Sequence, residues 1–331
     1  MPIAMITPEA LINTRGPWVS LLEDAGFTIH HPADRSFTRG LCSEQETVRV
    51  LQNASAVIAG GEYLTASVMA ALPNLRVIAR NGVGYDRVDI STATARGIPV
   101  TITPTSNHES VAETTFALLL AIAKRTIANN ASTRLGDWSR EQTEPIRGTT
   151  LGLVGLGRIG RSTAVRGRAF GMHVIAYETN PNDAFVRQHG IELVDFDTLL
   201  SRSDHVSIHC PLNPETHGLF HKGVFSKMKS GSVLLNTARG GLVVEADLID
   251  ALKSGHLAAA GLDVFEQEPT SPDNPLFQLD NVVVSPHRGG TDRLSQENMA
   301  IEAADCIAKL SRNQWPEGAV VNHELQSTWK W

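Results

Sequence analysis

The sequence of 331 residues has few cysteines, few aromatic residues and no excess of basic charge. Its three cysteines, Cys42, Cys210 and Cys306, are scattered and form no CxxC pair. This pattern excludes a disulfide framework and indicates a reducing, cytoplasmic location. The formal net charge of −6 argues against a nucleic-acid partner, because phosphate binding needs concentrated Lys and Arg.

Long hydrophobic runs are also missing. The most apolar run, FALLLAIA at 116–123, is too short to span a bilayer and is closed by Lys124 and Arg125. The N-terminus has neither a charged leader nor a long apolar core, so we expect no signal peptide. We therefore expect no membrane partner. We also expect no bound metal ion.

The chain does contain a regular alternation of short apolar runs with helical patterns. Such alternation predicts α/β domains, each a parallel sheet covered by helices on both faces, and 331 residues fit two of them. The expected strands are 2–7, 27–31, 56–60, 76–80, 98–103, 150–155, 172–177, 205–210, 232–238, 258–265 and 281–287. The expected helices are 18–26, 46–54, 67–75, 107–125, 158–171, 196–203, 245–255 and 293–312. Asn107 is expected to cap the fourth of these helices.

The segment LGLVGLGRIG at 151–160 is the most informative stretch of the chain. It is an apolar strand that runs into Gly155, Gly157 and Gly160 and then into a helical pattern, and Glu178 ends the next apolar run. In a dinucleotide site the first glycine permits a tight turn, the second admits the pyrophosphate, and the third lets helix and strand pack closely. The N-terminus of the helix then faces the phosphate charge. The segment therefore predicts a dinucleotide-binding turn.

Glu178 bears on which dinucleotide is bound. Its carboxylate can accept hydrogen bonds from the ribose hydroxyls of NAD and would repel the extra phosphate of NADP. No Arg follows it in ETNPND to offset that repulsion. NAD is therefore the expected cofactor, and the alternative is that Glu178 is only a solvated strand end.

These patterns predict two doubly wound parallel-sheet domains, a flavodoxin-like substrate domain and a Rossmann NAD domain, with a cleft between them. We expect residues 1–103 to form the first part of the substrate domain and residues 104–288 to form the NAD-binding domain. The helix and tail at 289–331 would return to complete the substrate domain. Ligand sites favour clefts between domains, so we expect the active site there.

Three candidate catalytic residues follow successive expected strands. Arg239 comes after SVLLN, Glu268 after AAAGLDVF, and His287 after NVVVSP. Ligands bind outside the carboxyl ends of the strands in an open α/β sheet, so the three side chains should reach one rim. A His near neutrality can exchange the proton that an alcohol loses to NAD, a carboxylate can fix the tautomer of that His, and a cation can hold the substrate. Taken singly, Arg239 could be a phosphate or backbone clamp, Glu268 a solvated loop residue, and His287 one of twelve histidines without a chemical role.

Together the motifs resemble those of the D-isomer-specific 2-hydroxyacid dehydrogenase family, on its phosphoglycerate dehydrogenase-like branch. The resemblance implies NAD-linked interconversion of a 2-oxoacid and the corresponding D-2-hydroxyacid. By motif, His287 would be the acid/base, Glu268 its paired carboxylate, and Arg239 the group that binds the substrate carboxylate and carbonyl. The matching segments are ARNGVGYDRVDI, NHESVAETTFALLLAIAKR, LGLVGLGRIG, LLSRSDHVSIHCPLNPET, MKSGSVLLNTARGGLVV, GLDVFEQEP and NPLFQLDNVVVSPHRGG.

The resemblance also implies a substrate loop, further cofactor contacts and a homodimer that pairs through the cofactor domain. The turn Asn81-Gly82-Val83-Gly84 resembles the loop whose backbone N–H groups hold the substrate carboxylate, and bare N–H groups form an anion nest. The cofactor contacts beyond the glycines and Glu178 would be Arg158, Ile159, Cys210, Pro211, Thr216, Thr237 and Asp263.

Three features depart from the phosphoglycerate enzymes of the family. Those enzymes carry an Arg just after the third strand, but here the stretch is Ala59-Gly60-Gly61-Glu62-Tyr63, and Glu62 is expected to repel a phosphate. The chain ends soon after the returning helix, so we expect no C-terminal regulatory domain. Arg288 follows the candidate His where an apolar residue is usual, and is either a solvated charge or a ligand for a second anion.

Two alternative functions remain open from the sequence. Some relatives on this fold serve as NAD-sensing corepressors and keep the same three residues, so the triad alone does not exclude a binding protein. A phosphite-type dehydrogenase is the second alternative, whereas Glu268 argues against a formate enzyme, which would carry Gln there.

Overall fold

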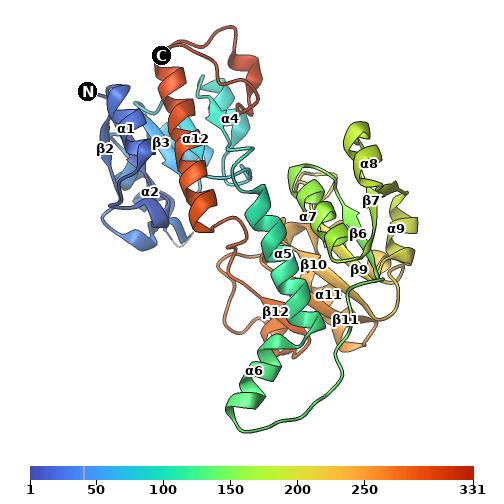
Figure 1. Ribbon diagram of the computed structural model, residues 1–331. Helices are drawn as coiled ribbons and strands as arrows, with labels where there is room; N and C mark the ends of the chain where they lie inside the picture. The colour runs from blue at the N-terminus through green and yellow to red at the C-terminus, as the bar shows by residue number, and fades with distance from the viewer. Residues whose placement is uncertain (40–41) are drawn as a thin grey trace. The chain divides into compact units, whose positions relative to one another are not determined.

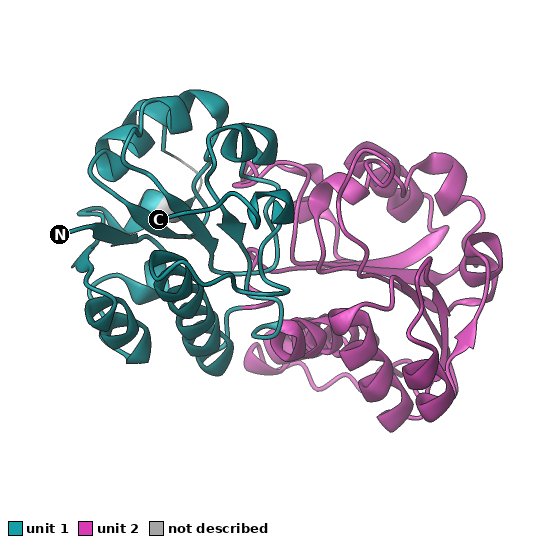
Figure 2. Ribbon diagram, turned by 90° about the horizontal axis from the view of Figure 1, so that it is seen from above, with its two compact units in different colours: residues 1–107, 291–331 teal, residues 108–290 magenta. Residues whose placement is uncertain are grey.

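The computed structural model describes residues 1–39 and 42–331, which form two compact units (Figures 1 and 2). Unit 1 comprises Met1–Asn107 and Thr291–Trp331, and unit 2 comprises His108–Gly290. Each unit is built on a parallel sheet with helices packed against both of its faces. The predicted fold class, two doubly wound α/β domains, is confirmed.

The sheet of unit 1 has five strands in the order β2-β1-β3-β4-β5, all paired in parallel. This is the flavodoxin-like order, in which the strand sequence reverses between β1 and β3. The strands are β1 (Ile3–Ile6), β2 (Thr28–His30), β3 (Ala56–Ala59), β4 (Val77–Arg80) and β5 (Val100–Thr101). The helices are α1 (Pro17–Asp24), α2 (Glu44–Leu51), α3 (Ala66–Ala70), α4 (Ile90–Ala95) and α12 (Arg293–Ser311).

Alternate residues of the unit 1 strands enter two separate hydrophobic clusters. In β1, Ala4 and Ile6 pack with side chains of α1 and α12, whereas Met5 packs with side chains of α2, α3 and α4. Successive side chains of a strand point to opposite faces, so a strand buried on both sides reads as a continuous apolar run. The apolar runs of the sequence therefore correspond to strands that are covered on both faces.

The sheet of unit 2 has seven strands in the order β12-β11-β10-β9-β6-β7-β8, again all parallel. Read from β8, this is the dinucleotide-fold order 3-2-1-4-5-6 with one further strand, and it reverses between β6 and β9. The strands are β6 (Thr150–Val154), β7 (His173–Tyr177), β8 (Glu192–Leu193), β9 (His205–Ile208), β10 (Ser232–Asn236), β11 (Leu257–Leu262) and β12 (Val282–Val284). The helices are α5 (His108–Ala123), α6 (Thr126–Arg134), α7 (Arg158–Ala169), α8 (Asp183–His189), α9 (Phe196–Arg202), α10 (Lys222–Phe225) and α11 (Glu245–Lys253).

Helices also divide between the two faces of the unit 2 sheet. Val233 and Leu235 of β10 pack in the cluster that includes α5 and α7, and Leu234 between them packs in the cluster that includes α9, α10 and α11. Short 3-10 helices lie in the connections of both units. They are η1 (Glu9–Leu11), η2 (Arg35–Arg39), η3 (Gly240–Leu242), η4 (Pro275–Gln278) and η5 (His323–Leu325).

The structure differs from the sequence prediction in the short elements and in one helix cap. Strand β8 and helices α4, α8 and α10 were not predicted, because two to seven residues show too little periodicity to be recognised. Asn107 directly precedes α5, as predicted, but its buried side-chain oxygen accepts no hydrogen bond from any described residue, so its side chain does not cap the helix. The apolar helix ends at Ala123, and Arg125, with a φ of 48°, separates it from α6.

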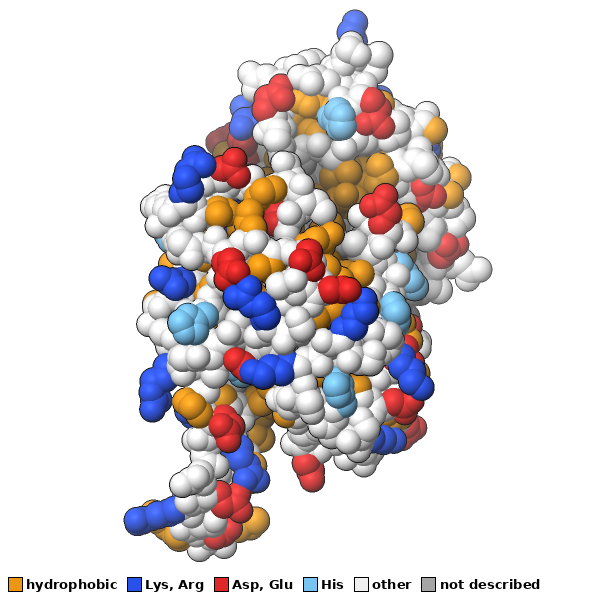
Figure 3. Space-filling view, turned by 90° about the vertical axis from the view of Figure 1, so that its right-hand side faces the viewer, with side chains coloured by type: hydrophobic (Ala, Val, Ile, Leu, Met, Phe, Trp, Pro, Cys, Tyr) orange, Lys and Arg blue, Asp and Glu red, His pale blue; other side chains and the backbone are white. Residues whose placement is uncertain are grey.

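Two properties of the surface and helices bear on possible partners. None of the described helices combines the length and the apolar content needed to cross a membrane. On the face shown in Figure 3, Lys and Arg side chains are interspersed with Asp and Glu side chains.

One buried histidine makes the stability of unit 2 depend on pH. His205 begins β9, is 8% exposed, and has no hydrogen-bond partner for either ring nitrogen among the described residues. Burial lowers the pKa of His205 to about 4, although the neighbouring carboxylate of Asp204 acts to raise it. In the unfolded chain a histidine titrates near pH 6.5, so between pH 6.5 and 4 only the unfolded state takes up this proton.

We therefore expect acidification from pH 7 to pH 5 to remove about 2 kcal/mol of stability through this residue. Over this interval the free energy of unfolding of His205→Phe, measured by urea unfolding, should fall by about 2 kcal/mol less than that of the wild type. The matched control is His173→Phe, at the exposed first position of β7, which should show the wild-type loss. Equal losses for the wild type and His205→Phe would show that His205 does not set this dependence.

Candidate active site

The glycine-rich turn joins β6 to α7 at the point where the strand order of unit 2 reverses. Gly155 has a φ of 101°, and a Cβ there would lie 2.8 Å from the backbone nitrogen of Cys210 at the end of β9. A Cβ at Gly160 would lie 2.2 Å from the carbonyl oxygen of Gly155. A Cβ at Gly157 would instead project into open space. Two of the glycines thus permit close packing, and the third leaves the backbone accessible.

The N-terminus of α7 follows directly from this turn. Gly157 is its N-cap, no side chain among the described residues caps it, and its first turn has no acidic residue. Arg158 is exposed and Ile159 is half-buried in that first turn. The first N–H groups of a helix lack intrahelical acceptors and carry the positive end of the helix dipole. The open backbone at Gly157 and the uncapped end of a twelve-residue helix therefore fit the phosphates of a dinucleotide.

Glu178, at the end of β7, is held against the same turn. Its carboxylate oxygens accept hydrogen bonds from the backbone N–H of Leu156 (2.7 Å) and of Asn180 (2.9 Å). Burial acts to raise the pKa of Glu178, but the hydrogen bonds from Asn180 and Leu156 outweigh it and hold that pKa below its usual range. Glu178 is therefore an ionised group fixed beside the turn rather than a freely solvated strand end.

The loop after β9 borders the turn on its other side. Thr216 closes this loop, because its hydroxyl donates to the carbonyl of Pro211 (2.7 Å) and accepts from the N–H of Asn213 (2.9 Å). Burial raises the pKa of the Cys210 thiol to about 11, so this side chain is a neutral group at neutral pH. Cys210, Pro211 and Thr216, predicted as cofactor contacts, thus belong to one loop at the switch point of the sheet.

The loop that carries Arg239 is shaped by a buried asparagine and a glycine. Asn236 accepts from the N–H of Ala238 (3.0 Å) and donates to the carbonyl of Arg239 (2.9 Å). The guanidinium of Arg239 donates to the carbonyl of Ala238 (2.6 Å). A Cβ at Gly240 would lie 1.8 Å from the carbonyl of Phe265, so only glycine lets the loop after β10 contact the loop after β11. The roles of Gly240 and Asn236 were not predicted, because no local pattern marks a residue that shapes a loop through contacts with a distant strand end.

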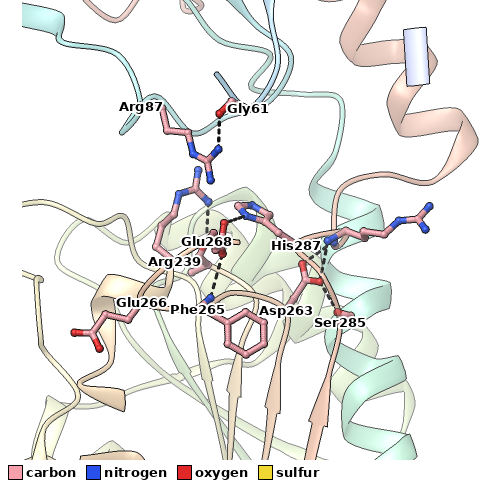
Figure 4. Close-up of polar contacts among 12 residues, drawn as sticks. Gly61, Arg87, Arg239, Asp263, Phe265, Glu266, Glu268, Ser285 and His287 are labelled. Atoms are coloured by element: carbon pink, nitrogen blue, oxygen red, sulfur yellow. Dashed lines mark hydrogen bonds and ion pairs between the residues drawn. The ribbon is translucent and has the colours of Figure 1, made fainter. Parts of the chain in front are cut away.

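The side chains of His287 and Glu268 are hydrogen-bonded to each other at the ends of neighbouring strands (Figure 4). The His287 Nδ1 lies 2.7 Å from Glu268 Oε2, and Glu268 Oε1 accepts from the N–H of Phe265 (3.1 Å). The side chain of His287 is 43% exposed, whereas that of Glu268 is 18% exposed. A carboxylate that binds Nδ1 keeps a proton on that nitrogen and leaves Nε2 as the reactive one. The backbone of His287 has a φ of 52°, a strained conformation that neighbouring contacts must maintain.

Asp263 supplies several of those contacts. It is buried, its carbonyl accepts from the N–H of His287 (2.7 Å), and its carboxylate accepts from the N–H groups of Arg288 (2.9 Å) and Gly289 (2.7 Å). The hydroxyl of Ser285 also donates to this carboxylate (Figure 4). Asp263 was predicted only as a cofactor contact, but the structure shows that it holds the loop at 285–289.

Two other predicted residues of unit 2 lie near this loop. Thr237 is buried, and its hydroxyl lies 3.0 Å from that of Thr115 on α5. The Arg288 side chain is exposed. Thr237 thus links the end of β10 to the helix that covers the sheet.

The predicted substrate loop of unit 1 follows β4. Gly82 has a φ of 150°, and its carbonyl accepts from the N–H of Thr103 (3.0 Å). The carbonyl of Gly84 accepts from Arg80 Nε (3.0 Å), and the Asn81 side chain donates to Gln296 on α12 (3.1 Å). The N–H groups of Gly82, Val83 and Gly84 donate to no acceptor within the described part of the chain. Carbonyls turned inward and unused N–H groups are the arrangement of an anion nest.

Glu62 requires a correction to the sequence analysis. Its side chain is 2% exposed and accepts hydrogen bonds from the Thr7 hydroxyl (2.6 Å) and the Gly60 N–H (2.9 Å). Burial raises the pKa of Glu62, against the opposing effect of the Thr7 hydrogen bond. The carboxyl is turned into unit 1, so the expected repulsion of a substrate phosphate is wrong.

Comparisons with known proteins agree with this geometry. Residues 116–289 match the model of the D-isomer specific 2-hydroxyacid dehydrogenase family, NAD binding domain. The chain is 46% identical over 269 residues to D-3-phosphoglycerate dehydrogenase of Mycobacterium leprae (strain TN), covering 78% of this chain and 51% of that one. It is 40% identical over 269 residues to glyoxylate reductase of Korarchaeum cryptofilum (strain OPF8), covering 79% and 80%.

A solved structure and the lengths of the relatives complete the comparison. The apo-structure of D-lactate dehydrogenase from Escherichia coli superimposes with a TM-score of 0.79 at 26% identity, covering 97% of this chain and 100% of that one. The chain spans about half the length of the curated phosphoglycerate dehydrogenases that it matches. With its family-model match, its two parallel-sheet units and these relatives, the chain belongs to the D-isomer specific 2-hydroxyacid dehydrogenase family.

Proposed function

We propose that the chain is an NAD-dependent D-2-hydroxyacid dehydrogenase that also reduces the corresponding 2-oxoacid. The observation that carries this proposal is the His287–Glu268 pair of 2.7 Å at the strand ends of a dinucleotide-type sheet. In this proposal unit 2 is the NAD-binding domain and unit 1 is the substrate domain. The relatives named phosphoglycerate dehydrogenase, glyoxylate reductase and D-lactate dehydrogenase support the same reaction class.

The cofactor would be held by the glycine turn and the residues around it. The backbone at Gly157 and the N-terminus of α7 would take the pyrophosphate, and Glu178 would accept the ribose hydroxyls. Because the Glu178 pKa is lowered, its carboxylate is charged at neutral pH and disfavours the additional phosphate of NADP. Further contacts are proposed for the residues that line the loops after β9, β10 and β11. These are Cys210, Pro211, Thr216, Thr237 and Asp263.

Side chains and backbone N–H groups of the protein would bind the charged groups of the substrate and transfer the proton of the reaction. Bound NADH supplies the hydride that reduces the substrate carbonyl. In unit 2 the guanidinium of Arg239 would polarise the substrate carbonyl, and in unit 1 the N–H groups of Gly82–Gly84 would provide a nest for a carboxylate. His287 Nε2 then donates a proton to the developing alkoxide, and the carboxylate of Glu268 holds the ring through Nδ1 before and after the transfer. Asp263 acts as a positioning residue, because it holds the backbone of the loop that presents His287.

The first test is NADH oxidation with a panel of 2-oxoacids: glyoxylate, hydroxypyruvate, pyruvate, 2-oxoglutarate and phosphohydroxypyruvate. His287→Gln should lower kcat by about 10²- to 10⁴-fold, because the general acid is lost, while NADH binding measured by fluorescence is retained. His173→Gln, at an exposed position of the same unit, is the control and should behave as wild type. An active His287→Gln protein would refute the assignment, and a wild type that binds NADH without turnover would favour the sensor alternative.

A second test concerns the pairing of Glu268 with His287. In oxidation of the D-2-hydroxyacid, the imidazole must accept the hydroxyl proton while Glu268 holds the ring through Nδ1. Glu268→Gln should therefore lower kcat by about 10²-fold or more, because the orientation and charge stabilisation of the base are lost. Glu266→Gln is the control, since its side chain points away from His287 in Figure 4. An unchanged kcat in Glu268→Gln would contradict the pairing.

We also propose a cytoplasmic homodimer that acts on a small 2-oxo or 2-hydroxy acid. An arm of unit 2, formed by α6 and the residues after it, supports the dimer (Figure 1). Helix α6 has no buried residue, and Leu135 and Trp138 after it are 87% and 77% exposed. Such exposed apolar groups are typical of surfaces that another chain covers. The three free cysteines agree with a reducing compartment.

The double variant Leu135→Ser/Trp138→Ser should shift the protein from dimer to monomer, because it removes the apolar contacts of the arm. Light scattering after size exclusion measures the mass directly. Leu294→Ser, at a 61% exposed apolar position of α12, is the matched control and should leave the dimer intact. A wild-type monomer, or a double variant that remains dimeric, would rule out this interface.

A further inference from the structure

Arg87 links two loops at the carboxyl ends of β3 and β4 in unit 1. It belongs to the loop between β4 and α4, yet its Nη1 donates to the carbonyl of Gly61 in the loop after β3 (Figure 4). Its guanidinium carbon lies 5.0 Å from the centroid of the Tyr63 ring. Its own carbonyl accepts from the N–H of Leu64 (2.8 Å). The side chain and the backbone of Arg87 together place its cation, which belongs to the loop after β4, against the loop after β3.

The contacts of Arg87 orient a planar cation. Guanidinium groups stack on aromatic faces and bind carboxylate or phosphate through paired N–H donors. The Gly61 carbonyl and the Tyr63 ring restrict the orientation of this guanidinium, so less conformational entropy is lost when an anion binds. An arginine arranged in this way is suited to recognise an anionic group.

The acidic residue in the same loop does not oppose this role. Glu62 lies between the two residues that contact Arg87, but its carboxyl turns away from the loop surface to Thr7 and Gly60. Burial raises its pKa, which favours the neutral form. The charge that this loop presents to a ligand is therefore governed by Arg87 rather than by Glu62.

The anion nest of unit 1 lies one strand away. The nest begins at Asn81, whose N–H donates to the carbonyl of Ala59 at the end of β3 (2.9 Å). Gly61 follows Ala59 by two residues. Neighbouring strands are about 4.8 Å apart, so the Gly61 carbonyl and the nest are separated by roughly 5–10 Å. That separation matches the span of a short carbon chain with an anionic group at each end.

We propose that Arg87 is a specificity-determining residue, which binds a second anionic group on the substrate while the N–H groups of Gly82–Gly84 bind the first carboxylate. The second group is a phosphate or a carboxylate at the far end of the 2-oxoacid. This inference rests on the proposed function and deepens it. The loop after β3 has no arginine at 60–65, and Arg87, 26 residues later than Gly61 in the sequence, places its guanidinium against that loop.

The test compares kcat/KM for dianionic and monoanionic substrates in Arg87→Met. Phosphohydroxypyruvate and 2-oxoglutarate carry the second anion as phosphate or carboxylate, and pyruvate and glyoxylate lack it. The kcat/KM of the variant should fall about ten- to a hundredfold more with one or both of the dianionic substrates than with pyruvate, chiefly through a higher KM. The substrate with the larger differential loss identifies the second group. Arg87→Lys should restore part of the difference, because it keeps the charge without the planar fork.

Arg76→Met is a closely matched control. Arg76 also donates to a backbone carbonyl, that of Lys330 (2.5 Å), and lies 5.3 Å from the centroid of the Trp329 ring. It precedes β4, so it is at the opposite edge of the sheet from Arg87. Its replacement should leave the ratio of kcat/KM values unchanged, which separates recognition of an anion from a general effect of losing a stacked arginine.

Several results would overturn the inference. Equal losses on dianionic and monoanionic substrates in Arg87→Met and Arg87→Lys would show a structural role only. A differential loss in Arg288→Met but not in Arg87→Met would assign the second anion to Arg288. A wild type that reduces only monoanionic 2-oxoacids would refute the role of Arg87 and leave the proposed function intact. A wild type that reduces no 2-oxoacid would refute the proposed function, and this inference with it.

Discussion

The parallel alignment of strands in each sheet is the constraint on which the candidate site depends. Because β10, β11 and β12 run in the same direction, their carboxyl ends meet at one edge, and the residues that follow them become neighbours. Residues as far apart in sequence as Arg239 and His287 thus emerge at one edge of the sheet. The same constraint acts in unit 1, where the loops after β3 and β4 lie side by side. An antiparallel sheet would send alternate loops to opposite edges.

Close backbone contacts refine that arrangement. Gly155 and Gly160 let β6, β9 and α7 converge at the turn, and Gly240 lets the loop after β10 contact the loop after β11. A Cβ at any of these positions would clash with backbone atoms of the facing segment and force the segments apart. The role of these glycines is therefore to bring polar groups from different strands within reach of one another.

The acidic residues around these loops differ in function because different groups donate hydrogen bonds to their carboxyl oxygens. Glu178 is held ionised by two backbone N–H groups, and Asp263 uses its oxygens to fix the loop of His287. Glu268 accepts from the N–H of Phe265 and faces the imidazole. Glu62 is buried, and that burial raises its pKa despite its hydrogen bonds. The residue type alone predicts a negative charge in all four cases, and the surroundings decide how each carboxyl behaves.

Much of the molecule could be predicted from local patterns. Apolar runs with the period of strands, helical patterns between them and the glycines at 155–160 predicted the α/β class, the long elements and the dinucleotide turn, since these depend on residues near one another in sequence. Short elements such as β8 and α10 could not be predicted, because tertiary packing rather than propensity stabilises them. Only the tertiary structure decided four further features. Glu62 is buried, and the Asn107 side chain accepts no hydrogen bond from the described residues. Asp263 binds the loop that carries His287, and Arg87 donates to Gly61. The sequence by itself determines which groups are available and which secondary structures carry them, whereas hydrogen bonds and burial across distant segments determine where each group points and what charge it carries.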